Sequence, residues 1–244
     1  TNYTALESST LEATGYTQGG TIKVGNDAPS TSNNNTNTGN TLPFSIFTSL
    51  DANSILNSSQ TNLANTTGGG FIETSGQTIN LLASINAGRG GMWLLDPNNV
   101  VISGTTTSGG TLPSYTAGSA SSYIKDVDIQ AQINSGTSVS IIANGTITQT
   151  SNLTFAPASG VDVSLTYDTR TGTAQAITLN GTTTNTGLGN LTLNYLSSGQ
   201  IVISGAINST SSGKINLIAQ SSYANATIPV SCPAGACASI YSTS

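Results

Sequence analysis

The carboxylates closest to one another in this sequence, at "KDVDI" (residues 125–129), are the first candidates for chemistry. Alternation along a β-strand would place Asp126 and Asp128 on one face and Lys125 on the other. Such a pair of acids can hold Ca²⁺ or flank a glycosidic bond. We favour the plainer interpretation of two solvated carboxylates on an outer face, because a general acid needs an environment that raises its pKa.

The other reactive residue types are sparse. Asp162, Asp168 and Arg170 form a second, weaker group of charges, and the chain has no His from which a nucleophile triad could be built. The segments "GRGG" and "GGGF" lack the Lys-Ser/Thr ending and the following helix of a phosphate-binding loop. Their glycines suit tight corners and close stacking of the chain. We therefore expect no catalytic residue, no cofactor and no bound metal.

The composition excludes several classes of protein. Only 6% of the 244 residues are charged, against roughly 25% in an average soluble domain. The five Lys and Arg residues are scattered, so no basic stripe can bind nucleic acid through its phosphates. Hydrophobic residues make up 36% and are regularly arranged, which argues against a disordered chain. No apolar stretch approaches the roughly 20 residues of a membrane span.

The sequence indicates an oxidising compartment. Cys232 and Cys237 stand close together in "SCPAGAC", and a metal site would need further ligands that no His can supply. We expect a small disulfide loop instead. The sequence does not begin with Met and shows no signal peptide at Thr1, so we expect a mature, processed or truncated product.

Short strands bounded by Gly, Asn or Ser dominate the pattern, whereas helical signals are nearly absent. Residues 175–195 align without a gap on residues 199–219, an offset of 24. The aligned apolar pairs are Ile177 with Ile201, Leu179 with Ile203, Leu191 with Ile215 and Leu193 with Leu217. Upstream, "VSLTY" (163–167) matches "LTLNY" (191–195) at an offset of 28, which places Tyr167 beside Tyr195. A fixed period of this size indicates stacked units that cannot bury their own apolar faces alone.

A unit of 24 residues with two or three short strands fits one coil of a parallel β-helix. Equivalent residues of successive coils would then stack about 4.8 Å apart. The alternative is an antiparallel sandwich, which is also built of short strands. Because a sandwich predicts no gap-free repeat, we favour an all-β fold of the parallel β-helix type.

Two motifs in the first half of the chain resemble a known family. They are "GGGFIETSG" (68–76) and "INAGRGGMWLLDPNNVVISG" (85–104). They are similar to a bipartite module of filamentous-haemagglutinin-like proteins, which are two-partner secretion exoproteins of Gram-negative bacteria. The matching residues are Gly69, Gly70, Phe71, Ile72, Glu73, Thr74, Ser75 and Gly76, followed by Gly91, Trp93, Leu94, Leu95, Asp96 and Pro97.

The resemblance implies a right-handed parallel β-helix, or β-solenoid, with protruding loops, exposed on or released from the cell surface. It implies a role in adhesion or biofilm, an outer-membrane transporter as partner during secretion, and no catalytic residues. The residues themselves agree with a structural module. Phe71 and Trp93 offer large apolar area, Glu73 and Asp96 are expected to fix turns by accepting hydrogen bonds from backbone amides, and Pro97 should end a strand.

Composition and repeats divide the chain into three parts. Residues 1–104 form an irregular β-helical part that contains the module, with a polar loop at 28–45. Residues 105–228 form regular coils of about 24 residues, and residues 229–244 form a Cys-bounded segment. The disulfide of that segment either caps the last coil and its open edge or, as in some secreted relatives, tethers the chain at the outer membrane.

These observations predict a stiff, weakly charged surface adhesin that presents loops to a host or surface glycan or protein. A subunit that polymerises with copies of itself by stacking coil ends is the second hypothesis. A β-helical enzyme that cleaves polysaccharides is the third. Many Asn-x-Ser/Thr sequons are present, and Asn144, Asn180 and Asn208 are the candidate glycan acceptors.

Overall fold

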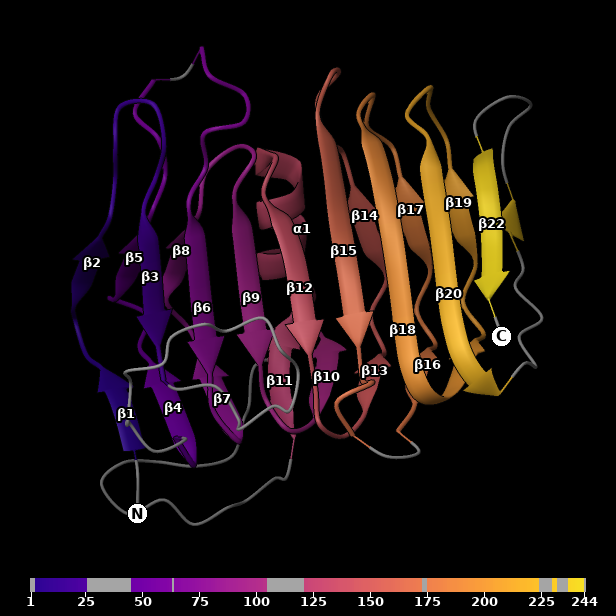
Figure 1. Ribbon diagram of the computed structural model, residues 1–244, viewed down its shortest axis with the longest axis horizontal. Coiled ribbons are helices and arrows are strands. Elements are labelled where there is room, and N and C mark those ends of the chain that lie inside the picture. The colour runs from indigo at the N-terminus through magenta and orange to yellow at the C-terminus, as the bar shows by residue number, and fades with distance from the viewer. Residues whose placement is uncertain are drawn as a thin grey trace.

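The computed structural model describes residues 3–25, 45–62, 64–104, 121–172, 175–223, 230–231 and 237–243. Strands and a single helix, α1 (Asp126–Ser135), make up these ranges (Figure 1). The loop expected at 28–45 lies, except for Ser45, outside the described residues. So do residues 105–120 and Cys232.

Successive strands run along three faces of one elongated structure. The first face is an unbroken ladder of β3 (Thr21–Val24), β6 (Phe71–Ser75), β9 (Met92–Asp96), β12 (Ser138–Ile142), β15 (Asp162–Asp168), β18 (Asn190–Ile203), β20 (Ile215–Tyr223) and β22 (Cys237–Thr243). The second face holds, in spatial order, β1 (Tyr3–Leu6), β4 (Phe47–Leu50) and β7 (Thr78–Leu81), then β11 (Ser122–Lys125), β10 (Val100–Ser103), β13 (Ile147–Gln149) and β16 (Ile177–Leu179). The third holds β2 (Thr10–Glu12), β5 (Ile55–Asn57) and β8 (Ser84–Asn86), then β14 (Leu153–Phe155), β17 (Thr183–Asn185), β19 (Ile207–Ser209) and β21 (Val230–Ser231).

Within the described residues, every pairing between these strands is parallel. The antiparallel sandwich is therefore wrong, and the arrangement is solenoid-like, with each coil hydrogen-bonded to the next. The long strand β18 turns the corner between two faces, since its first part pairs with β15 and β20 and its last part with β16. In the segment 229–244, β21 and β22 continue this parallel pairing onto β19 and β20.

The register predicted from the repeat is confirmed residue by residue. Ile177 pairs with Ile201 and Leu179 with Ile203, at the offset of 24. Tyr167 pairs with Tyr195, at the offset of 28. Upstream the offset is longer, because Ile147 pairs with Ile177.

The core runs along the inside of the coils. Side chains of β15 and β18 alternate between buried and half-exposed positions, as expected for strands with one face inward. Leu165, Leu193 and Leu217 stack in register and are 2% exposed or less. Each buried Leu contributes about 1.5–3 kcal/mol relative to an exposed one, so the repeated ladder stabilises the fold without charged residues.

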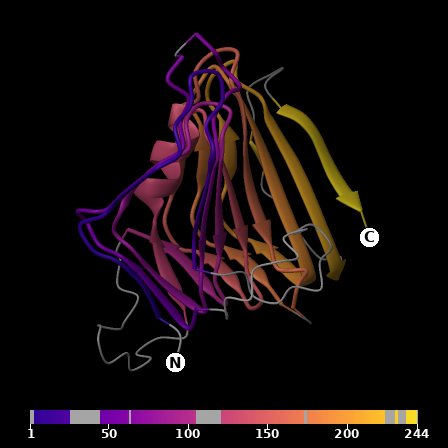
Figure 2. The same cartoon turned by 60° about the vertical axis from the view of Figure 1, so that its left-hand side comes forward.

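Helix α1 lies in a sequence whose helical signals are nearly absent, and it was not expected. Ile129 and Ile133, spaced by four residues, are buried against the core. Gly136 ends the helix with φ +91°, and its N–H donates to the carbonyl of Ile133 at 3.1 Å, a left-handed cap that favours glycine. Figure 2 shows α1 on the outside of the stacked strands, where it replaces a strand of the third face.

Candidate functional site

The two halves of the family-like module form neighbouring strands of the first face. β6 pairs with β9 in register, so that Ile72 lies beside Trp93 and Glu73 beside Leu94. The gap between the two motifs is thus one turn of the coil. Two motifs separated in sequence become one continuous patch of ladder.

The inward half of the module is apolar and closely packed. Ile72 and Trp93 are fully buried. The indole N–H of Trp93 donates to the hydroxyl of Thr74 at 3.3 Å, so the one polar atom of the indole ring has a partner inside the core.

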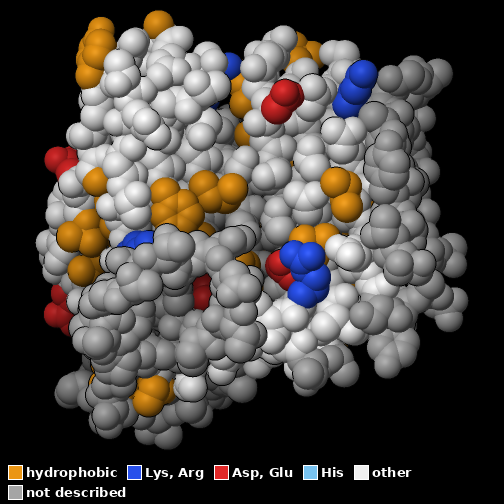
Figure 3. Space-filling model, viewed as in Figure 1, with side chains coloured by type: hydrophobic (Ala, Val, Ile, Leu, Met, Phe, Trp, Pro, Cys, Tyr) orange, Lys and Arg blue, Asp and Glu red, His pale blue; other side chains and the backbone are white. Residues whose placement is uncertain are grey.

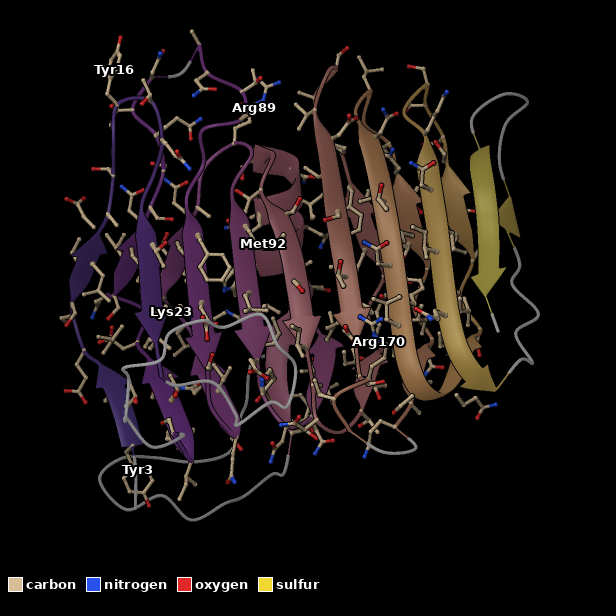
Figure 4. The ribbon with its side chains drawn as sticks, viewed as in Figure 1. Tyr3, Tyr16, Lys23, Arg89, Met92 and Arg170 are labelled. Atoms are coloured by element: carbon tan, nitrogen blue, oxygen red, sulfur yellow. The ribbon has the colours of Figure 1, made fainter. Side chains whose placement is uncertain are left out.

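The outward half is built around a buried carboxylate. Glu73 is 2% exposed, and its carboxylate lies 2.6 Å from the ammonium of Lys23 on β3. The Ser75 hydroxyl donates to the same carboxylate at 2.9 Å, and Lys23 lies 5.9 Å from the centre of the Phe71 ring. Figure 4 labels Lys23 and the neighbouring Met92 on this face. Glu73 lies in the middle of β6, and the turn-fixing role expected of it stays a prediction.

The remaining module residues lie at the ends of these strands. β9 ends at Asp96, directly before Pro97, as expected for a residue that cannot donate to a ladder. Asp96 is 8% exposed, and the backbone N–H of Gly76 donates to its carbonyl at 3.2 Å. The two motifs are therefore also hydrogen-bonded to each other at the ends of β6 and β9.

Glycines let the coils approach closely at the start of the module. The backbone N–H of Gly69 donates to the carbonyl of Arg89 at 2.9 Å, and that of Gly70 to the carbonyl of Ala87 at 2.8 Å. A Cβ on Gly70 would overlap the carbonyl oxygens of Ser58 and Gly20. Close stacking of backbone is thus what these glycines permit here.

The structure corrects the geometry expected for Asp126 and Asp128. Both belong to the first turn of α1, not to a strand, and residues two apart on a helix point about 200° away from each other. Burial raises the pKa of Asp128, an effect that nearby Lys125 partly opposes. Asp126 accepts a hydrogen bond from the backbone N–H of Val127 at 2.7 Å. Negative charge in a first turn is favourable to the helix itself, which accounts for both acids without a ligand.

The second group of charges is split between the two ends of β15. Arg170 and Asp168 form an ion pair at 2.7 Å, and hydrogen bonding to Asp168 raises the pKa of Arg170. Asp162 instead accepts a hydrogen bond from the amide of Asn190 at 2.8 Å. Six residues of extended chain, about 20 Å, separate the two acids. The fold does not bring this group together.

The sequons differ in whether their side chains are already bonded. The amide of Asn65 donates to the Thr17 carbonyl at 2.6 Å, and Asn190 is bonded as described. No hydrogen bond holds the side chains of Asn144, Asn180 or Asn208 in the part of the chain that the structure describes, and Asn180 is exposed. These three were the acceptors selected from the sequence, and their occupancy stays a prediction.

Two further expectations concern cysteines and metals. Only the backbone of Cys237 is described, on β22, and Cys232 lies outside the described ranges, so the disulfide stays a prediction. Across the described residues no group of three or more metal-ligating side chains comes together. None of the described helical residues forms a span long and apolar enough to cross a membrane.

Comparison of the chain with protein-family models, with curated proteins and with solved structures gave no match. The resemblance to filamentous-haemagglutinin-like proteins therefore rests on the residues of the module alone.

Proposed function

We propose that this chain is a right-handed β-helical rod of an extracellular exoprotein of a Gram-negative bacterium, which acts without enzymatic activity as a surface adhesin. The observation that carries the proposal is the unbroken parallel ladder of the first face from β3 to β22. Each coil added to such a ladder lengthens the molecule without widening it. A stiff rod of this kind can hold a binding surface at a distance from a cell.

The outer surface supports attachment better than catalysis. Outward positions of β15 and β18 are mostly small polar residues, such as Ser164, Thr166, Thr192 and Asn194, and they are half-exposed. Figure 3 shows charged side chains as few and scattered among uncharged ones on this side. Hydroxyl and amide groups of this kind can bind the hydroxyls of a glycan. We do not propose polysaccharide cleavage, because the acids that would carry it diverge.

Adhesion of coated beads tests the proposal. Beads carrying the chain should adhere to epithelial monolayers, to immobilised glycans or to glass several-fold more than beads carrying an inert protein. One variant, Thr192→Lys with Asn194→Lys, changes the first face, and a control variant, Thr184→Lys, changes the third face. If only one of these two variants loses adhesion, the face that it changes is the binding face. Periodate treatment of the target separates a glycan ligand from a protein ligand.

Two results would overturn the proposal. Adhesion no better than that of the inert protein on every surface would remove the function. Left-handed winding of the coils in an experimental structure would remove the fold proposed for it.

Self-assembly is the second candidate, and the first coil favours it. Within the described residues, β2 pairs only with β5 and β3 only with β6, so each offers one unpaired edge. Leu6, Leu11 and Ala13 pack against the core but are only partly buried. A second copy whose last coil stacked here would extend the same parallel ladder.

Electron microscopy distinguishes the two candidates. A polymerising subunit should give fibrils with an axial repeat of one molecule. Leu11→Lys should reduce them to short rods in a chain that circular dichroism still shows to be folded. Isolated rods at every concentration of the unaltered chain would leave the adhesin as the function.

A further inference from the structure

Two of the three faces are interrupted at one level of the solenoid. On the second face the ladder stops at β7 and begins again at β11, and on the third face it stops at β8 and begins again at β14. The first face continues through this level, because β12 pairs with both β9 and β15. The strand order is also reversed here, since β11 lies on the β7 side of β10 although it follows β10 in the chain.

Side chains rather than backbone ladders bridge the interruption on the third face. The Gln132 amide of α1 donates to the carbonyl of Ile85 on β8 at 2.8 Å. On the other side of the helix, Gln130 accepts from the N–H of Thr154 on β14 at 2.8 Å, and Asn134 from the N–H of Ala156, just after β14, at 2.6 Å. α1 therefore caps two strand edges with three amides.

The second face is bridged in the same way. The N–H of Ile79 on β7 donates to the hydroxyl of Ser122 on β11 at 2.9 Å. Backbone bonds reappear at the corners next to the first face, where the Gly90 N–H donates to the Gly136 carbonyl at 2.9 Å and the Asn98 N–H to the Gln77 carbonyl at 3.1 Å. Among the described residues, the backbone ladder is thus continuous along the first face and interrupted on the other two.

The number of layers differs between the faces as well. Between β9 and β15 the first face has one strand, β12, whereas between β7 and β13 the second face has two, β11 and β10. A helix is about 10 Å wide, so α1 fills about two strand spacings of about 4.8 Å each. The second and third faces therefore hold about one layer more than the first. The first face stays continuous at this level. If the gap between the strands on the second and third faces widens or narrows, the two parts of the solenoid must therefore rotate about the first face.

We propose that residues 121–137 form a hinge. β11 releases from β7 and α1 releases from β8 and β14, while the β9–β12 ladder stays paired. The strands from β1 to β9 and the strands from β12 to β22 then rotate relative to each other about the first face, as two parts of the rod on either side of the hinge. This inference needs only the order and bonding of the strands, and it holds whether or not the rod is an adhesin.

Hydrogen exchange of the intact chain tests the hinge. Amides of α1 should exchange at least ~100-fold faster than those of β9 and β12, because a helix of 10 residues that is released from its packing is only marginally stable in water and opens without global unfolding. Gln130→Ala with Asn134→Ala should speed exchange of α1 a further ~30-fold, the effect of two lost hydrogen bonds, and leave β15 and β18 unchanged.

A matched control comes from the block beyond the hinge. Asn152 accepts from the N–H of Thr182 at 2.8 Å, so Asn152→Ala removes a comparable bond between coils and should not speed exchange of α1. Equal amide exchange rates in α1, β9 and β12 of the unaltered chain would overturn the hinge. Because this comparison uses the unaltered chain, it tests the hinge even if the double variant fails to fold.

Discussion

Alkaline pH is expected to unfold this protein because two tyrosines stack inside its core. The rings of Tyr167 and Tyr195 lie with their centres 5.4 Å apart, and both side chains are fully buried. The Tyr167 hydroxyl donates to the Gln149 side chain at 3.2 Å. Burial raises the pKa of Tyr167 well above its ordinary value, and Tyr195 beside it raises it further. Burial also raises the pKa of Tyr195.

The sign of the effect follows from these shifts. Below about pH 10, the ordinary pKa of Tyr, both residues are neutral in the folded and unfolded chains, and the pair adds no pH dependence. Above it the unfolded chain releases up to two protons that the folded chain retains. Stability then falls by about 1.4 kcal/mol per pH unit for each tyrosine. At pH 12 the pair has cost about 5 kcal/mol, comparable to the whole stability of many domains.

Guanidinium unfolding followed by circular dichroism between pH 8 and about pH 12 measures this slope. Tyr167→Phe and Tyr195→Phe should each halve it, and the double variant should remove it. Tyr16, which is 73% exposed, supplies the control, since Tyr16→Phe should leave the slope unchanged. The slope decides rather than the midpoint, because Tyr167→Phe also leaves Gln149 without its donor. A double variant that keeps the full slope would refute the reasoning.

Three further outcomes are expected. Gly70→Ala should lower the guanidinium midpoint by the equivalent of about 3 kcal/mol or more, because the new Cβ would overlap two carbonyl oxygens. Gly160 has φ +72° and open space around it, so Gly160→Ala should cost only about 1–2 kcal/mol. Intact-mass spectrometry of the secreted chain should show one glycan fewer in Asn180→Gln, and an unchanged mass difference would contradict occupancy there. Alkylation should label Cys232 and Cys237 only after reduction, and loss of their disulfide should cost about 2 kcal/mol; labelling without reduction would show free thiols.

The repeat predicted the fold because in-register stacking leaves its record in the sequence. Where like residues must lie beside like, as Leu191 beside Ile215, a gap-free offset gives both the direction and the register of neighbouring strands. Register could be predicted to the residue for the coils that share a period. The winding hand leaves no such record, since either hand stacks the same residues.

Helix α1 was not predicted, because residues 125–129 were interpreted as a strand. Ile129 and Ile133 at a spacing of four, followed by Gly136, are a helical pattern with a glycine cap, whereas alternation of Asp126 and Asp128 suggested a strand. The reversed position of β11 could not be found in any local pattern. It depends on which side of β10 the strand that follows it is placed.

The carboxylate of Glu73 links the charge of the module to the register of its strands. β3 pairs with β6 across 50 residues of sequence, since Ile22 lies beside Ile72, so no short period sets this register. A slip of one residue would turn Ile72 outward and push Glu73 into the core beside Trp93. An ionised acid there, away from Lys23, would cost several kcal/mol. The acid among apolar residues thus favours the observed register of the first face at a place where no short repeat sets it.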